Sequence, residues 1–378
     1  MGKQLEQSPS KSIGSLDSLL WPWAAMQSTI DSYFWWLDQG FGSPYKRDEA
    51  VLPWTTPNKI MLELSSVRLR DFSRSRAGTP AIVCAPYALH GALIADFAAG
   101  HSIVEALQSQ GLDRVYVTDW RSASSDMRFL SIDSYLADLN VAIDEIGSPV
   151  DLIGLCQGGW MSLIYAARFP EKVQRLVLAG APVDISIESE LSRMVARTSK
   201  AAFNGFVNGE GGIVRGGHLL RFWRTPPDPE VDLQRTLSPE IAGEKELLDR
   251  FASWHGKTLD LPGAYYLQTV NWIFRENRLA TGSFVALGRQ LHLKLVTAPV
   301  FLLAGAEDEI VPSEQALATA SLLGTPAEMI ETANAASTHL GLFIGGRTLA
   351  DSWRRIARWL NRGSENYAHA RPHPPEAR

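Results

Sequence analysis

Short apolar runs and longer amphipathic repeats alternate along most of the chain. The short runs are bounded by proline, glycine or charged residues, as is typical of buried β-strands, whereas the longer stretches place apolar residues at helical intervals. Strands that alternate with helices in this way predict a mostly parallel, doubly wound α/β sheet with helices on both faces. We expect strands within 60–72, 80–86, 114–120, 149–155, 172–184, 299–305 and 327–335, and helices within 101–112, 131–147, 160–169, 314–324 and 348–360.

The alternation stops between about residues 185 and 291, where helical pieces and loops rich in glycine and proline take over. We therefore predict a core formed by residues 46–184 and 292–362, with residues 185–291 inserted as a mainly helical cap. Aromatic residues of the cap could line an apolar channel, but such residues more often form a core, and we interpret them in that way. They are Phe222, Trp223, Trp254, Tyr265, Tyr266 and Trp272.

Both ends of the chain are polar, and we expect residues 1–16 and 363–378 to be disordered. Between them, residues 17–45 form a segment with helical character and many tryptophans. This segment either covers the core as a helix or contacts a hydrophobic polymer, a granule surface or a partner chain. Its tryptophans are Trp21, Trp23, Trp35 and Trp36.

The composition of the chain excludes some classes of function. The 378 residues are 45% hydrophobic and 20% charged, which is typical of a globular protein. A net charge of −5 argues against binding to nucleic acid. Two cysteines do not make a disulfide framework, and neither a secretion signal nor a long apolar stretch is present. We therefore expect a cytoplasmic protein without a transmembrane segment.

The strongest chemical signal is the sequence Gly154-Leu155-Cys156-Gln157-Gly158-Gly159, which lies between a predicted strand and a predicted helix. It matches the nucleophile elbow of the α/β-hydrolase fold, in which glycines two residues before and after the nucleophile permit a strained turn. The alternative is a buried, inert cysteine, but the start of a helix favours a thiolate. Cys156 is therefore the predicted nucleophile, with Gly154 and Gly158 as the glycines of the elbow.

In this fold an acid and then a histidine follow the nucleophile along the chain. Asp308 comes directly after the strand at 299–305, and we select it over its neighbours Glu307 and Glu309, which more often would be solvated loop charges. Among eight histidines, His339 lies between the last strand and the last helix, where the fold places its base. We expect Asp308 to orient His339 and His339 to deprotonate Cys156.

Catalysis of acyl transfer also requires two hydrogen-bond donors for the oxyanion. The fold supplies the backbone amide of the residue after the nucleophile, Gln157, and one from the loop after an early strand, for which Tyr87 or Ala88 is the candidate. His90 in the same loop could touch substrate, although a polar surface role is more common. No metal-binding cluster or nucleotide-binding loop is found, so we expect no cofactor and no metal.

The chain resembles the superfamily of polyhydroxyalkanoate synthases and intracellular polyhydroxyalkanoate depolymerases. The resemblance rests on the elbow motif and on the segments 115–120, 306–312 and 338–343, and it covers about residues 80–360. It implies the α/β-hydrolase fold with Cys156, Asp308 and His339 as the triad. It also implies a hydroxyacyl polymer or a hydroxyacyl-coenzyme A as substrate, a storage granule as a surface that the protein could bind, and either a homodimer or a partner subunit.

The two branches of the superfamily differ in the acceptor of the acyl group. The double glycine Gly158-Gly159 resembles the synthases, whereas segments 264–284 and 333–347 resemble the depolymerases. Synthases usually carry a histidine directly after the catalytic aspartate, and Glu309 occupies that position here. We therefore interpret the chain as a hydrolase of hydroxyacyl esters, with a polymerising acyltransferase as the alternative. A catalytically silent protein that binds granules is the third hypothesis.

Overall fold

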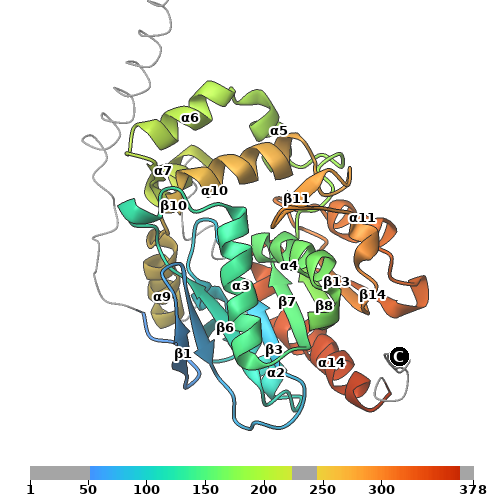
Figure 1. Cartoon of the computed structure of the whole chain (residues 1–378). Helices are drawn as coiled ribbons and strands as arrows, with labels where there is room; N and C mark the ends of the chain where they lie inside the picture. Colours follow the sequence, from blue (N-terminus) through green and yellow to red (C-terminus); the bar gives the residue numbers. More distant parts are fainter. Residues whose placement is uncertain (1–51, 224–244, 367–378) are drawn as a thin grey trace, which may run out of the picture. The chain divides into compact units, whose positions relative to one another are not determined.

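A computed structural model of the chain describes residues 52–223 and 245–366 (Figure 1). The chain divides into two units, Met1–Asp48 and Glu49–Arg378, and every described residue belongs to the second. The predictions for residues 1–16 and 17–45 therefore fall outside the described residues, as does most of the predicted tail. Within the described part, no helix is long and apolar enough to cross a membrane.

A single eight-stranded sheet forms the centre of the second unit, in the order β1-β2-β6-β3-β7-β8-β13-β14. The hairpin β1–β2 and the pair β2–β6 are antiparallel, and the pairs from β6 to β14 are parallel, which confirms the predicted sheet. The central strands are buried along their whole length because helices cover both faces. The strands are β1 Lys59–Glu63, β2 Val67–Asp71, β3 Ala81–Cys84, β6 Val115–Trp120, β7 Val150–Leu155, β8 Val173–Ala179, β13 Val300–Gly305 and β14 Ile330–Ala335.

Helices of the core connect these strands at the predicted places. α2 packs against α14, and α3 packs against α4, and the two pairs lie on opposite faces of the sheet (Figure 1). The last helix continues to Asn366, and the predicted tail, 363–378, lies mostly outside the described residues and stays a prediction. Ile356 and Leu360 anchor this helix in the core, and no proline interrupts the chain before Pro372. The helices are α2 Ile103–Gln108, α3 Ile132–Ile146, α4 Gln157–Arg168, α11 Ser313–Leu322 and α14 Arg354–Asn366, the last preceded by the π-helical turn η7 Leu349–Trp353.

The described part of the segment inserted between β8 and β13 is mainly helical, as predicted. Two short antiparallel pairs, β9–β10 and β11–β12, interrupt its helices. Two residues of this segment contact the loop after β3, since the amide of Leu259 donates to Leu89 and the hydroxyl of Tyr265 on α10 donates to Tyr87. The elements are α5 Glu190–Arg197, α6 Lys200–Asn208, β9 Ile213–Val214, α7 Gly216–Trp223, α9 Lys245–Gly256, β10 Leu261–Pro262, α10 Gly263–Gln268, η4 Thr269–Arg275, β11 Phe284–Ala286 and β12 Arg289–Leu291.

A fully buried ion pair joins two neighbouring strands in this core. Asp151 on β7 accepts hydrogen bonds from Nε and a terminal nitrogen of Arg175 on β8 at 2.8 and 2.7 Å, and each side chain is only 2% exposed. Burial raises the pKa of Asp151 to about 6, although both interactions with Arg175 oppose the shift. The pair is therefore a place where the loss of one partner leaves an uncompensated charge in the protein interior.

We expect Asp151→Asn to lower the free energy of unfolding by about 3–5 kcal/mol, because the guanidinium of Arg175 remains buried without its countercharge. Urea unfolding at pH 7.5 measures this change. The control is Glu331→Gln, which removes an exposed pair with Arg355 whose side chains are 42% and 48% exposed and should cost less than about 1 kcal/mol. Equal losses in the two variants would contradict the expectation.

Candidate active site

Cys156 lies in a strained turn between β7 and α4. Its backbone has φ 48° and ψ −117°, a conformation that a residue other than glycine rarely adopts. The flanking glycines allow the turn, because a Cβ atom at Gly158 would lie 2.1 Å from the carbonyl oxygen of Cys84. A Cβ atom at Gly154 would lie 2.5 Å from the Cα atom of Gly159. The geometry is thus that of the predicted elbow, with a half-buried Cys156 side chain at its tip.

Asp308 and His339 are in direct contact. Nδ1 of His339 lies 2.7 Å from Oδ2 of Asp308, and both side chains are buried, at 8% and 0% exposure. Oδ1 of Asp308 accepts hydrogen bonds from the backbone amides of Ile310 and Val311 at 2.9 and 2.8 Å, which fixes the carboxylate after β13. The neighbouring Glu307 and Glu309 are exposed. Of the three acids considered from the sequence, only Asp308 meets His339.

The ring of His339 also interacts with Cys156. Burial alone would lower the pKa of His339, but the electrostatic effects of Asp308 and Cys156, together with hydrogen bonds of the ring to both, raise it well above its ordinary value. Phe343 packs edge-on against the imidazole with ring centroids 5.3 Å apart. The three side chains therefore form a continuous chain of contacts in which the imidazolium form is favoured.

The predicted oxyanion donors lie at the same edge of the sheet. Gln157 is the first residue of α4, and the close approach of Gly158 to the carbonyl oxygens of Cys84 and Ala85 brings the start of this helix against the end of β3. Tyr87 is buried and Ala88 is half-buried in the loop that follows β3. Within the described residues, the backbone amides of Gln157, Tyr87 and Ala88 donate no hydrogen bond. Their catalytic role remains a prediction.

The contacts of His90 and the burial of Cys84 indicate that both residues have structural roles. His90 stacks on Trp254 and His255, with ring centroids 4.5 and 4.9 Å apart, and its Nδ1 lies 3.4 Å from the carbonyl oxygen of Lys257. Cys84 is completely buried, and burial raises the pKa of its thiol to about 12. A thiol with such a pKa is an inert core residue and no competitor to Cys156.

Some residues that hold the site together carried no signal in the sequence. Oγ1 of Thr118 accepts a hydrogen bond from the amide of Ala85 at 3.0 Å, and Nε1 of Trp120 donates one to the carbonyl oxygen of the same residue at 2.8 Å. Both side chains belong to β6, where the sequence indicates only a buried strand. His101 also differs from expectation, since it lies in the short strand β5, His101–Ser102, and not in a helix. Nδ1 of His101 lies 2.7 Å from the carbonyl oxygen of Ile344.

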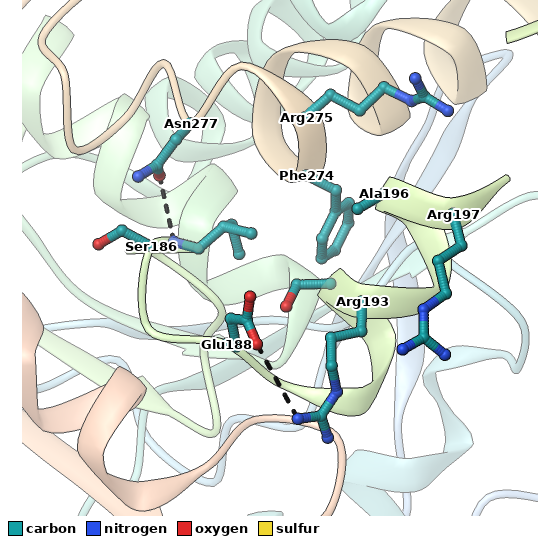
Figure 2. A pocket seen from close by; sticks show the side chains of 10 residues that line it. Ser186, Glu188, Arg193, Ala196, Arg197, Phe274, Arg275 and Asn277 are labelled. Carbon is teal, nitrogen blue, oxygen red and sulfur yellow. Dashed lines mark hydrogen bonds and ion pairs between the residues drawn. The ribbon is translucent and has the colours of Figure 1, made fainter. Parts of the chain in front are cut away.

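A cavity of about 470 Å³ lies between α5 and the end of η4 (Figure 2). Two of its cationic side chains are engaged, since Arg193 pairs with Glu188 at 4.0 Å and Arg275 donates to the carbonyl oxygens of Val195 and Thr198. None of Cys156, Asp308 and His339 lines it, so it is separate from the elbow. In the described part of the chain, no group of three or more His, Cys, Asp or Glu residues is arranged to hold a metal ion.

Known proteins share both the fold and the sequence. Residues 89–336 match the family model of the alpha/beta hydrolase fold. The chain is 30% identical over 296 residues to the poly(3-hydroxyalkanoate) polymerase subunit PhaC of Synechocystis sp., a match that covers 74% of this chain and 76% of the relative. It is 27% identical over 327 residues to the protein of the same name from Haloferax mediterranei, covering 82% of this chain and 65% of that relative's length.

Solved structures with low sequence identity show the same fold. A bromoperoxidase from Bacillus anthracis superposes with a TM-score of 0.50 at 16% identity, covering 81% of this chain and 100% of the other. An enol-lactonase from Burkholderia xenovorans superposes with a TM-score of 0.50 at 15% identity, also covering 81% and 100%. At this level of identity the similarity concerns the fold alone.

Proposed function

Because the chain belongs to the α/β-hydrolase family and, within it, to the family of poly(3-hydroxyalkanoate) polymerase subunits PhaC, we propose that it polymerises 3-hydroxyacyl groups supplied as coenzyme A thioesters. The relatives support this alternative over the hydrolase that we preferred from the sequence. The acyl transfer itself is proposed from the contacts of Cys156, His339 and Asp308 at the elbow, and the observation that favours polymerisation is the similarity to polymerase subunits. That the relatives are named subunits supports the expectation of a partner subunit.

In the first step, His339 takes the proton of the Cys156 thiol, and the resulting thiolate Sγ attacks the thioester carbonyl of the substrate. A carbon–sulfur bond to the enzyme forms, the carbonyl π electrons move onto oxygen, and the amides of Gln157 and of the loop after β3 stabilise this oxyanion. When the tetrahedral intermediate collapses, the bond to coenzyme A breaks and the leaving thiolate takes a proton from the His339 imidazolium. Asp308 holds the ring in place through Nδ1. The product of this step is a hydroxyacyl-Cys156 thioester.

In the second step, the terminal hydroxyl of a polymer chain attacks the acyl-cysteine. His339, now neutral, accepts the hydroxyl proton, an ester bond forms and Cys156 is released as a thiolate. Attack by water in place of the chain end would give hydrolysis with the same residues in the same roles. The acceptor therefore distinguishes the proposed polymerase from the hydrolase.

The decisive experiment gives the purified protein 3-hydroxybutyryl-coenzyme A in one reaction and amorphous polyhydroxybutyrate in another. Release of free coenzyme A thiol together with chloroform-soluble polymer would support the proposal. Soluble hydroxyacid from the polymer, without polymer growth in the first reaction, would replace it with the hydrolase. Inactivity in both reactions would favour the silent granule-binding protein.

The proposed acid can be tested against its neighbour. Asp308→Asn should lower kcat about 10⁴-fold, because the histidine loses the group that fixes its tautomer. The same change should lower the pKa of His339, because it removes a charge that raises this pKa. The alkaline decrease in activity should therefore begin at a lower pH than in the wild type. The matched control Glu309→Gln changes an exposed carboxylate and should leave the pH–rate profile unchanged. A damaging Glu309→Gln with a mild Asp308→Asn would reverse the assignment.

A further inference from the structure

Three carbonyl groups of the loop after β3 are held by hydrogen bonds from outside the loop. The oxygen of Ala85 accepts from Nε1 of Trp120 at 2.8 Å, as described above. The oxygen of Tyr87 accepts from the hydroxyl of Tyr265 at 3.4 Å, and that of Leu89 accepts from the amide of Leu259 at 2.7 Å. Since Leu259 and Tyr265 belong to the segment inserted between β8 and β13, this segment holds the loop that carries the second oxyanion donor.

Tyr265 is well placed to act as a donor. It is only 1% exposed, and burial raises the pKa of its hydroxyl well above the ordinary value, with smaller contributions from Tyr87, Cys84 and Cys156. The hydroxyl therefore stays protonated. Its ring packs against those of Tyr87 and Tyr135, with centroids 5.1 and 4.9 Å away, so its position is fixed by the surrounding core.

The neighbouring tyrosine hydroxyls are engaged elsewhere. The hydroxyl of Tyr135 donates to that of Tyr87 at 2.8 Å, and the hydroxyl of Tyr87 donates to the carbonyl oxygen of Asp260 at 3.3 Å. Among the side chains described, Tyr265 is thus the one that donates to the backbone carbonyl of Tyr87.

The carbonyl of Tyr87 and the amide of Ala88 belong to the same peptide plane. In a trans peptide the C=O and the N–H point in opposite directions, so a hydrogen bond that fixes the carbonyl also fixes the direction of the amide. We infer that Tyr265 is a positioning residue that orients the Ala88 amide as the second oxyanion donor. This inference rests on the proposed acyl transfer at Cys156, and it selects Ala88 over Tyr87.

The test is Tyr265→Phe, which removes the hydroxyl and keeps the buried ring. We expect kcat for acyl transfer from 3-hydroxybutyryl-coenzyme A to fall about fivefold, the typical effect of one hydrogen bond, with KM and melting temperature close to wild type. The matched control is Tyr266→Phe on the same helix, because the buried hydroxyl of Tyr266 has no hydrogen-bond partner within the described residues. Equal kcat in the two variants would overturn the inference.

A second measurement distinguishes an effect of Tyr265→Phe on oxyanion stabilisation from an effect on the nucleophile. Alkylation of Cys156 by iodoacetamide is a displacement at carbon without an oxyanion, so Tyr265→Phe should react at the wild-type rate, as followed by peptide mass spectrometry. Buried Cys84, with the pKa of its thiol raised to about 12, does not interfere. A parallel loss of alkylation and acyl transfer would mean that Tyr265 acts on the nucleophile and would overturn the inference. Undiminished acyl transfer by Cys156→Ala would instead refute the proposed function itself.

Discussion

Replacing Cys156 with alanine is expected to reduce acyl transfer from 3-hydroxybutyryl-coenzyme A by about 10⁶-fold, to the level of the uncatalysed background. Without Sγ no acyl-enzyme can form, and the remaining oxyanion donors have no covalent intermediate to stabilise. Alanine accepts the same strained backbone as cysteine at this position, because both carry a Cβ atom. The fold should therefore be retained, with a melting temperature close to that of the wild type. Coenzyme A release measures the loss.

Cys84→Ala provides the matched control for this variant. Cys84 is completely buried at the end of β3, where its carbonyl oxygen lies against Gly158 and its thiol interacts with Ser162 and Thr118. We expect this variant to keep its activity per folded molecule and to lose at most about 1–2 kcal/mol of stability. Intact-protein mass spectrometry should find a hydroxyacyl adduct on the Cys84→Ala variant and none on the Cys156→Ala variant. An adduct on Cys156→Ala would show that another residue is the nucleophile.

His339→Gln should have the second largest effect, a fall in kcat of about 10⁵- to 10⁶-fold. Glutamine can occupy the space beside Asp308 but cannot exchange a proton with Cys156 or with the leaving thiolate. In the wild type the pKa of His339 is raised by Asp308 and Cys156 against the opposing effect of burial, so the imidazolium that protonates the leaving group persists to a higher pH than in a free histidine. As the pH rises through this raised pKa, the imidazolium is lost and acylation should slow.

The pH–rate profile therefore distinguishes a catalytic His339 from a structural one. We expect the residual rate of His339→Gln to lack the alkaline decrease seen in the wild type. His292→Gln is a suitable control, because His292 is exposed and should leave rate and profile unchanged. If His339→Gln retained both the rate and the alkaline decrease, the base would have to be another residue.

Single residues do not indicate whether water or the end of a polymer chain accepts the acyl group. Glu309 stands where synthases usually carry a histidine, but it is exposed, while the buried Asp308 makes the contact with His339. An exposed side chain next to the acid has little physical influence on the choice of acceptor. Similarity over most of the chain, to polymerase subunits, was needed to prefer polymerisation.

The alternation of apolar runs and amphipathic repeats determined the parallel sheet and the place of the elbow. Local physics suffices for this, since buried strands must be apolar and the turn at Cys156 requires glycines at 154 and 158. The order of elements along the chain then limited the candidate acid to a few residues after β13 and the candidate base to the segment between β14 and the last helix. The same pattern placed the last helix, whose buried side chains Ile356 and Leu360 belong to the core.

Only the tertiary structure decided between groups that are neighbours in sequence. Glu307, Asp308 and Glu309 have the same chemistry, but the fold buries Asp308 alone and turns it towards His339. In the same way, Tyr265 and Tyr266 are adjacent aromatic residues of α10, and only the hydroxyl of Tyr265 reaches the loop after β3. These contacts join residues 31 and 178 positions apart. No local sequence pattern encodes contacts between residues so far apart along the chain, because these contacts form when the sheet and the inserted helices pack against each other.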